Sequence, residues 1–455
     1  MSSSNLYLKR QGANFLSIIN DLKRNRQAAA DDLDIPLAQI EAIIAGDMDI
    51  PADVLDRAVR LWPVNRRDFM IIDDDAPAGV RVMRRSASEA SSRVFARGGV
   101  PYYEYRDTAM SKLAPLRPEW ILELVEVDDD DPASPQVQWN HGHFMHQFTM
   151  FVNAVNFYYM ENGERKVMKA NTGDSMYITP FVPHSFATRR GDAERLYGGR
   201  KGLILALTYG NKVAGDVQHE LSALGGDLPP RFLLDTSSRE QYCASLLRQQ
   251  LDAASMTPAD AARRASIADH RMSEFVSGRA MPTAEEYRRL ADAFTVNSRD
   301  LMPPDEIDPK VVTRTRAGTP SRRFGRYCVT DMAGIRYLPY SKALLVDVEG
   351  PDGGTDLDVP LHQYCYNLGE RPITITWRAN GTTHQDVLNR DDSVYVKPHV
   401  PHGFSTPGAR GTMVSLRVAG KTPGDPQREL SHIGAENIRS TYLEHSLWYR
   451  EEKKQ

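Results

Sequence analysis

An internal repeat that spans almost the whole chain places the strongest constraint on the fold. Four short motifs occur twice and in the same order, which indicates a duplication in which each half folds into the same set of units. The pairs are VNRRDFM (64–70) and VNSRDLM (296–302), FAR (95–97) and FGR (324–326), GDSMYITPFVPHSF (173–186) and DDSVYVKPHVPHGF (391–404), and GDVQHELS (215–222) and GDPQRELS (424–431).

Each copy changes its periodicity part-way along. Residues 15–70 and 244–302 have the apolar spacing of short amphipathic helices, whereas the segments after about 90 and 318 are rich in β-branched and aromatic residues and carry Asn-Gly turns. We therefore expect an α+β protein, a tandem duplication in which each copy is a small helix-turn-helix-like helical domain followed by a cupin (jelly-roll) β-barrel. The expected domains are 1–75 and 231–308 (helical), 85–223 (first barrel) and 318–447 (second barrel).

Composition limits the class of protein. A chain with 41% hydrophobic and 25% charged residues is typical of a soluble globular protein, and a net charge of −4 provides no overall attraction for nucleic acid. Three widely spaced cysteines without a CxxC motif make a disulfide framework unexpected and fit the cytoplasm. No apolar run approaches the roughly 18 residues of a membrane helix, and the N-terminal stretch lacks the apolar core of a signal peptide. We expect a cytoplasmic protein without a membrane span.

A ligand-sensing transcription regulator is the first alternative, because helix-turn-helix units joined to jelly rolls also occur in that class. A recognition helix requires basic and amide side chains. The candidate in the first copy, PLAQIEAIIAGD (36–47), contains no Lys or Arg, and the arginines of the second candidate alternate with acidic residues. Nucleic acid is therefore not the expected partner.

The stretch NHGHFMHQF (140–148) contains three histidines and a glutamine, and it predicts a metal site. On a strand, His143 and Gln147 share one face, with His141 on the same parity and His146 on the other face. His184 follows after a hairpin, in TPFVPHSF (179–186). Non-heme iron is commonly held by two histidines and a carboxylate. Here an amide stands where the carboxylate is expected.

The second copy conserves this pattern less well. His402 matches His184, but the upstream stretch is LHQYCYNL, in which His362 is followed four residues later by Tyr366. We expect that the second barrel has lost its metal and has been kept for packing.

These residues carry a resemblance. The repeated helix-turn-helix and cupin order, NHGH…Q followed by GDSMYITPFVPHSF, and the upstream RGGVPYYEY resemble the phosphonate-processing non-heme iron oxygenases, which include hydroxyethylphosphonate dioxygenase, methylphosphonate synthase and hydroxypropylphosphonate epoxidase. The resemblance to the first two covers nearly the whole chain. It implies Fe(II) as the cofactor, held by His143, Gln147 and His184.

The third ligand distinguishes the family members. The epoxidase has Glu where this chain has Gln147, and the dioxygenase takes a Glu from just before the PH motif, where this chain has Ile178 and Thr179. Methylphosphonate synthase is similar to this chain at both places. The positions that bind phosphonate in the family hold Lys23, Arg97, Tyr105 and Asn140, whose cationic and amide groups suit a dianion.

The activity that the resemblance implies is the conversion of 2-hydroxyethylphosphonate and O2 to methylphosphonate and carbon dioxide, with C–C cleavage and without 2-oxoglutarate. The alternative is the dioxygenase reaction, which gives hydroxymethylphosphonate and formate. Helical domains in this family reach neighbouring barrels, so Lys23 serves either its own site or that of a partner in a homo-oligomer.

Overall fold

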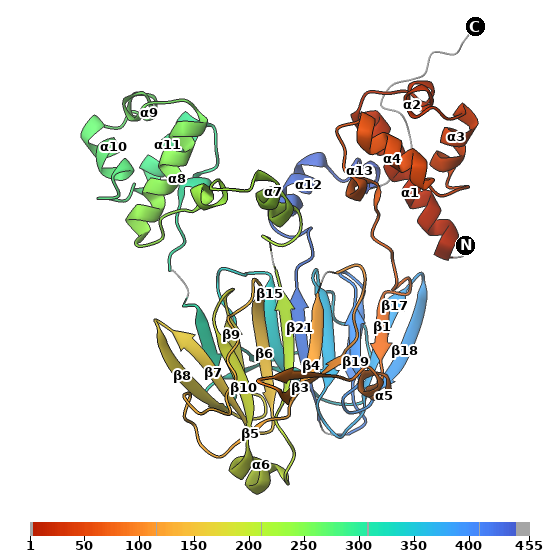
Figure 1. Ribbon diagram of the computed structural model, residues 1–455, viewed down its shortest axis with the longest axis vertical. Coiled ribbons are helices and arrows are strands. Elements are labelled where there is room, and N and C mark those ends of the chain that lie inside the picture. The colour runs from red at the N-terminus through yellow and green to blue at the C-terminus, as the bar shows by residue number, and fades with distance from the viewer. Residues whose placement is uncertain (1–2, 115, 211, 307–308, 409, 443–455) are drawn as a thin grey trace.

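The computed structural model describes residues 3–114, 116–210, 212–306, 309–408 and 410–442. Two groups of helices stand apart from each other above a body of β-sheets (Figure 1). The first group contains α1 (Ser3–Asp21), α2 (Arg26–Leu33), α3 (Leu37–Ala45), α4 (Ala52–Leu61) and η1 (Arg66–Phe69), and the second contains α8 (Arg239–Ala253), α9 (Pro258–Ala265), α10 (Asp269–Val276), α11 (Ala284–Phe294) and η3 (Ser298–Leu301).

Each helical group has its own apolar core and well-formed helix ends. Thr257 and Thr283 cap α9 and α11 with capping boxes, and Asn25 caps α2. Of the predicted domain limits, residues 1–2, 307–308 and 443–447 lie outside the described part of the chain. The mixed α+β class is the one expected from the sequence.

Two seven-stranded sheets and two smaller ones make up the β body. The large sheets have the same strand order when the two halves are matched: β12-β9-β6-β11-β4-β3-β2 and β1-β19-β16-β21-β15-β14-β13. Their bounds are β2 (Arg93–Arg97), β3 (Val100–Asp107), β4 (Arg117–Glu123), β6 (His146–Val152), β9 (Ser175–Ile178), β11 (Leu203–Tyr209), β12 (Val311–Arg314), and β1 (Val80–Met83), β13 (Ser321–Phe324), β14 (Tyr327–Asp331), β15 (Ser341–Val348), β16 (His362–Asn367), β19 (Ser393–Val396), β21 (Gly411–Val418).

A smaller sheet faces each large one and encloses a second core with it. The first barrel has β5-β10-β7-β8 and the second has β18-β17-β20. The bounds are β5 (Glu126–Val127), β7 (Val155–Glu161), β8 (Glu164–Ala170), β10 (His184–Arg189), β17 (Ile373–Ala379), β18 (Thr382–Leu388) and β20 (His402–Ser405). We call residues 93–209 the first barrel and 321–418 the second barrel.

The two barrels exchange one edge strand each. β1 follows the first helical group but pairs with β19 of the second barrel, whereas β12 follows the second helical group and pairs with β9 of the first. These two strands fall between the predicted domains, and they carry each helical group toward the opposite barrel (Figure 1). The exchange also covers two sheet edges that would otherwise be open.

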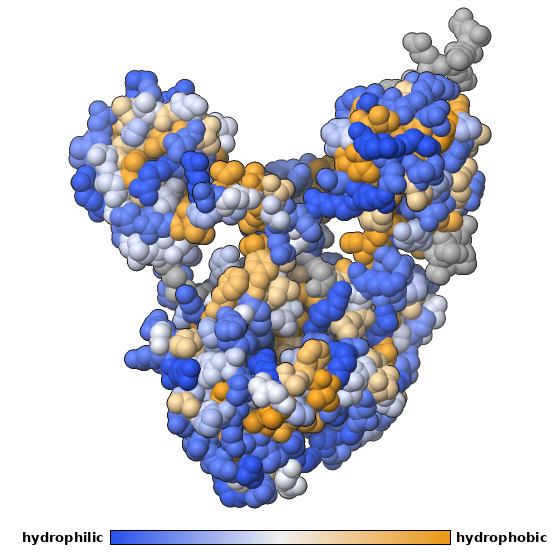
Figure 2. All heavy atoms as spheres, in the orientation of Figure 1, coloured by the Kyte–Doolittle hydropathy of each residue, from blue (hydrophilic) through white to orange (hydrophobic). Residues whose placement is uncertain are grey.

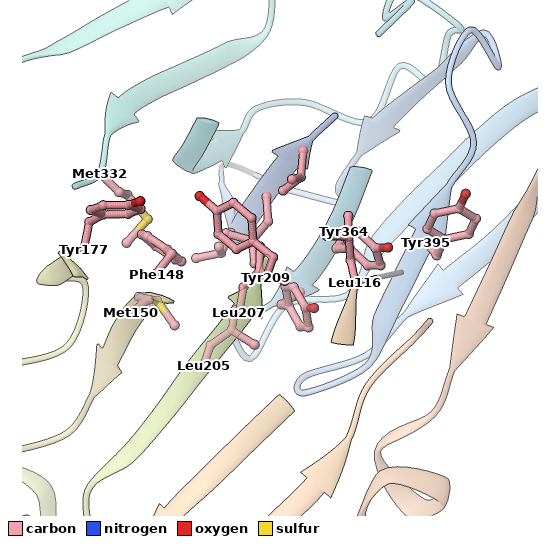
Figure 3. Close-up of a cluster of buried hydrophobic side chains, with 14 of the residues drawn as sticks. Leu116, Phe148, Met150, Tyr177, Leu205, Leu207, Tyr209, Met332, Tyr364 and Tyr395 are labelled. Atoms are coloured by element: carbon pink, nitrogen blue, oxygen red, sulfur yellow. The ribbon is translucent and has the colours of Figure 1, made fainter. Parts of the chain in front are cut away.

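An aromatic layer joins the two large sheets. Phe148, Tyr177 and Tyr209 from one sheet meet Tyr364 and Tyr395 from the other in one buried cluster (Figure 3). Paired hydrogen bonds repeat the same contact in both directions across this layer: Ala333 N to Ser175 Oγ (2.9 Å) matches Ala109 N to Ser393 Oγ (2.8 Å). The barrels therefore pack about an approximate two-fold relation, with a layer of buried aromatic side chains between them.

The remaining helices are short and peripheral. They are α5 (Arg85–Ala90), α6 (Arg190–Tyr197), α7 (Asp216–Leu224), η2 (Pro229–Phe232), α12 (Asp425–Ile433) and α13 (Ile438–Tyr442). α7 buries none of its side chains, and apolar residues gather on the visible surface near it (Figure 2). In the described ranges, no helix combines the length and the apolar character that crossing a membrane requires.

Candidate metal centre

The predicted ligands come together at one end of the first barrel. Gln147 is the second residue of β6, and His184 is the first residue of β10, on the facing sheet. His143 does not lie on a strand, as the alternation argument required; it lies in the loop before β6, where its carbonyl accepts a hydrogen bond from Phe181 N at 2.8 Å. Gly142, with φ of +76°, lets the loop pass within contact of Phe181. The loop thus turns His143 back over Gln147.

Hydrogen bonds to the backbone fix the protonation of both histidines. Nδ1 of His143 lies 2.9 Å from the carbonyl of Met145, and Nδ1 of His184 lies 2.8 Å from that of Val182. A carbonyl only accepts, so each Nδ1 carries the proton and each Nε2 has a lone pair that can bind a metal. This is the tautomer that a metal-binding histidine needs. Sequence gives no signal for such carbonyl partners.

The amide of Gln147 is oriented by a residue that the sequence argument missed. Gln147 Nε2 donates to Oγ1 of Thr149 at 2.9 Å, which leaves Gln147 Oε1 3.0 Å from Nε2 of His143. A cation shared between two acceptors that face each other in this way would satisfy both of them. Neighbouring ligands, each about 2.1 Å from a metal and at right angles, lie about 3 Å apart. Thr149 could have been found from its position two residues after Gln147, on the same strand face.

Burial supports a neutral donor set. His184 and Gln147 are each 5% exposed, and the ring centroids of His143 and His184 are 5.2 Å apart. Burial is the main cause that lowers the pKa of His184 to about 3, so the ring is neutral at physiological pH. Within the described residues, no three His, Cys, Asp or Glu side chains form a group that could hold a metal. A metal at this site therefore requires the amide.

The other two histidines of the stretch point elsewhere. His146 lies on the opposite face of β6, where its Nδ1 hydrogen-bonds to the hydroxyl of Tyr177 and its ring packs beside Tyr209. His141 is exposed to solvent. Neither side chain contacts Gln147 or His184, so the alternation argument placed His146 correctly.

The predicted phosphonate contacts surround the ligands. Asn140 Oδ1 accepts the backbone N–H of His184 at 2.8 Å, and its Nδ2 lies 3.1 Å from His184 Nε2. The guanidinium of Arg97 stacks on Tyr103, 4.5 Å from the ring centroid. Burial raises the pKa of Tyr105, and the charge of Arg97 acts in the opposite direction, which places the two side chains close together. Burial is the largest cause of the lowered pKa of His184, and the charge of Arg97 contributes in the same direction as the smallest of four effects. A cation thus lies beside the neutral ligand set.

Lys23 is not brought to this site within its own chain. It lies between α1 and α2, is exposed, and donates from Nζ to the carbonyl of Asp21 at 3.0 Å. The first helical group stands above β1, β17 and β18, whereas the site lies at β6 and β10 (Figure 1). The reason is the strand exchange, because the pairing of β1 with β19 draws this group toward the second barrel.

The two residues that mark the missing acid differ in placement. Ile178 is the direct cross-strand partner of Gln147, so both side chains emerge on the same face of the sheet. Thr179 comes after the end of β9, and its N–H donates to the carbonyl of Lys310 at 2.9 Å. A side chain at 178 is therefore the one that shares the sheet face of the candidate ligand Gln147.

Known proteins are similar to this chain, although no family model matches it. A methylphosphonate synthase of Nitrosopumilus maritimus (strain SCM1) is 45% identical over 448 residues, which are 97% of this chain and 96% of that protein. The chain belongs to the methylphosphonate synthase family.

Solved structures extend this relation. The structure of Streptomyces albus HEPD, with its substrate 2-hydroxyethylphosphonate and Fe(II) bound, matches this chain with a TM-score of 0.90 at 35% identity. The match covers 98% of this chain and 99% of that one. Another 2-hydroxyethylphosphonate dioxygenase structure has a TM-score of 0.71 at 19% identity, over 94% and 99% of the two chains, and shares the fold.

The strand register of this chain corrects which residues of the second barrel correspond to the candidate ligands of the first. Gln147 faces Ile178 and Thr208, and Gln363 faces Val396 and Arg417 in the same way. Gln363 is therefore the counterpart of Gln147, and His362 is that of His146, not of His143. Like His146, His362 hydrogen-bonds through Nδ1 to a tyrosine hydroxyl, at 2.7 Å. Spacing in LHQYCYNL had suggested His362 and Tyr366 instead.

A buried carboxyl group behind the site was not predicted. Glu123 is fully buried, and among the described residues neither of its carboxylate oxygens has a hydrogen-bond partner. Burial raises its pKa well above the usual range, with Arg97 acting in the opposite direction. It pairs across the strands with Tyr103, and the matching partner of Tyr327 in the second barrel is Val348. The fold thus accepts an apolar residue at this strand position. A comparison of the two halves of the sequence could have revealed Glu123 as the exception.

Replacing Glu123 with valine is expected to stabilise the protein at pH 7.5 by about 1 to 3 kcal/mol, the usual cost of an unsatisfied buried polar group. Because the folded-state pKa is raised, the unfolded chain gains by ionising, so the stabilisation grows as pH rises above the usual glutamate range and shrinks below it. Thermal unfolding at pH 4.5 and 7.5 checks this. The exposed strand residue Glu164, changed to valine, is the control and should alter stability by less than about 0.5 kcal/mol. A Glu123→Val protein that melts lower at pH 7.5 would contradict the expectation.

Proposed function

We propose that this protein is a methylphosphonate synthase that uses Fe(II) and O2 to convert 2-hydroxyethylphosphonate to methylphosphonate and carbon dioxide. We further propose that each half is a helix-turn-helix-like domain followed by a cupin barrel, with iron in the first barrel alone. The observation that carries the proposal is the amide of Gln147, held by Thr149 with its oxygen toward Nε2 of His143. Atoms balance, since one substrate and one O2 give methylphosphonate, carbon dioxide and water.

His143, Gln147 and His184 would hold the iron, each through an atom that carries a lone pair. At Nε2 of His184 the iron would replace the contact with Asn140 Nδ2, which lies 3.1 Å away. When bound, iron supplies the redox chemistry that activates O2, with open positions for the substrate. The three ligands are neutral, so the site keeps the full charge of a divalent ion. A phosphonate carries close to two negative charges, and this charge favours its binding next to the ligands.

The residues around the ligands would orient the substrate. Arg97, fixed over the ring of Tyr103, provides a fork of donors for phosphonate oxygens. Asn140, whose oxygen is already engaged by the backbone of His184, has its amide nitrogen directed at the ligand set. Tyr105 adds a hydroxyl that burial keeps protonated. Together these groups would supply hydrogen-bond donors to the phosphonate oxygens.

Lys23 would take part only from a neighbouring copy. Its placement above the second barrel favours a lysine contact made in a homo-oligomer, in which the first helical group of one copy covers the first barrel of another. The transcription-regulator alternative has no support in α3, where the exposed face has no Lys or Arg.

The product assay tests the function. Anaerobic protein loaded with one equivalent of Fe(II) is mixed with 2-hydroxyethylphosphonate and then exposed to O2, without a keto acid. We expect oxygen consumption and a phosphorus NMR signal of methylphosphonate, with carbon dioxide released. Metal-free protein is the control and should leave the substrate unchanged.

Hydroxymethylphosphonate and formate as the only products would assign the protein to the dioxygenase reaction instead. Unchanged substrate in the presence of bound iron would remove both oxygenase assignments. The dioxygenase is kept as the second candidate because of the close structural match to an enzyme crystallised with this substrate.

A further inference from the structure

The second barrel preserves two of the three ligand positions. Gln363 and His402 are each 1% exposed and occupy the places of Gln147 and His184. The place of His143 is taken by Val359, whose carbonyl accepts the N–H of His399 at 2.8 Å, just as that of His143 accepts the N–H of Phe181. A valine has no lone pair to donate, so this barrel is one ligand short.

The acceptors that face a metal in the first barrel are already satisfied in the second. Arg417 Nε donates to Oε1 of Gln363 at 2.8 Å, Nε2 of Gln363 donates to Nε2 of His402 at 2.9 Å, and Nδ1 of His402 donates to the carbonyl of Val400 at 2.7 Å. Arg417 stands on β21 where the first barrel has Thr208. A guanidinium thus provides the positive charge that a metal would have provided, and the second barrel is not merely an apolar remnant.

Within the described residues, no carboxylate pairs with the positive charge of Arg417. In the described chain, neither terminal nitrogen of its guanidinium makes a hydrogen bond or an ion pair, and no carboxylate lies within ion-pair distance. Burial lowers the pKa of Arg417. The other nearby candidate, Arg326, occupies the place of Arg97 but is neutralised by Asp356 at 3.3 Å, which also accepts from the hydroxyl of Tyr327 at 2.9 Å. One partly buried cation remains with two unused donor groups.

We propose that the second barrel is a metal-free binding site for a small oxyanion, with Arg417 as its cation. An unpaired, partly buried guanidinium is costly unless an anion balances it. Its two terminal nitrogens form a planar fork that matches two oxygens of one carboxylate or phosphonate group. The charge of Asp358 also acts on His402, and Asp358 Oδ1 lies 2.8 Å from Nδ1 of His399. Arg417 is the cation that a ligand would contact, so the ligand class is a small carboxylate or phosphonate that binds through two oxygens.

This proposal does not depend on iron in the first barrel, so it is tested in metal-free, full-length protein. Arg97→Ala is made first, to remove the phosphonate contact of the first barrel. Calorimetric titrations with methylphosphonate and, separately, with acetate then measure binding to the second barrel alone. We expect one equivalent of at least one of the two anions to bind. Comparing the two anions decides between the phosphonate and carboxylate classes.

Arg417→Thr in the same background installs the residue that the first barrel carries at this strand position. It is expected to weaken binding by about 10- to 100-fold, as the loss of hydrogen bonds to a charged group implies. Arg417→Lys keeps the charge but loses the fork, and should bind with intermediate affinity. Thermal unfolding of each variant verifies the fold. Absence of binding of both anions to Arg97→Ala, or binding that is equally strong in a folded Arg417→Thr protein, would overturn the proposal.

Discussion

Replacing Gln147 with alanine is expected to lower the affinity for Fe(II) by at least about 100-fold and to abolish product formation. The change removes one of three protein ligands, and even residues that only orient a ligand typically contribute 10- to 100-fold to metal affinity. Only two nitrogens, from His143 and His184, would remain. Anaerobic competition against a chelator measures the affinity, and the metal content per chain gives the stoichiometry.

The matched control for this variant is His141→Ala, in the same loop but exposed and without a ligand role. It should bind iron and form product like the unaltered protein. Stoichiometric iron and full turnover in Gln147→Ala would exclude the amide from the site. Because Gln147 is buried, the melting temperature of the metal-free variant must also be compared with that of the metal-free parent.

The second large effect is expected from moving the third ligand to the neighbouring strand. In Gln147→Ala/Ile178→Glu, a carboxylate on β9 emerges on the same sheet face as the lost amide, because residues 147 and 178 are cross-strand partners. The variant should regain iron, and the carboxylate should lower the charge of the site by one unit. The resemblance implies that the dioxygenases use an acid just before the PH motif, where this chain has Ile178 and Thr179. We therefore expect the product to change from methylphosphonate toward hydroxymethylphosphonate.

Thr179→Glu in the same Gln147→Ala background is the control for position. Residue 179 follows the end of β9, so its carboxylate should fail to restore iron. Phosphorus NMR of the reaction mixture identifies the products. Iron regained with methylphosphonate as the only product would show that the product does not depend on which strand supplies the third ligand.

Much of the fold could be predicted from the sequence because two signals agree. The repeat requires two copies of one plan, and the change from helical to strand periodicity divides each copy. The metal ligands could be proposed because His143, Gln147 and His184 are chemically distinctive. The placement of His146 on the strand face opposite Gln147 followed from strand alternation alone, since it lies within β6.

Other features depend on contacts that local patterns do not encode. His143 lies in a loop, so a strand argument reached a reasonable pairing with Gln147 for the wrong reason. Spacing misaligned the second barrel because its ligand loop has lost the histidine that would have fixed the register. The pairing of Gln363 with Val396 and Arg417 reveals the correct match. The exchanged strands β1 and β12 are four residues long, and nothing in such short segments specifies a distant partner.

The strand exchange also has a consequence for synthesis on the ribosome. The edge of β9 in the first barrel is completed at residues 175–178, but its partner β12 is translated only at 311–314. At roughly 5 to 20 residues per second, the nascent first barrel exposes this edge for on the order of ten seconds. An open edge can pair with another chain. Expression yield should therefore depend on chaperone capacity during translation, whereas refolding of the full-length chain is free of this delay.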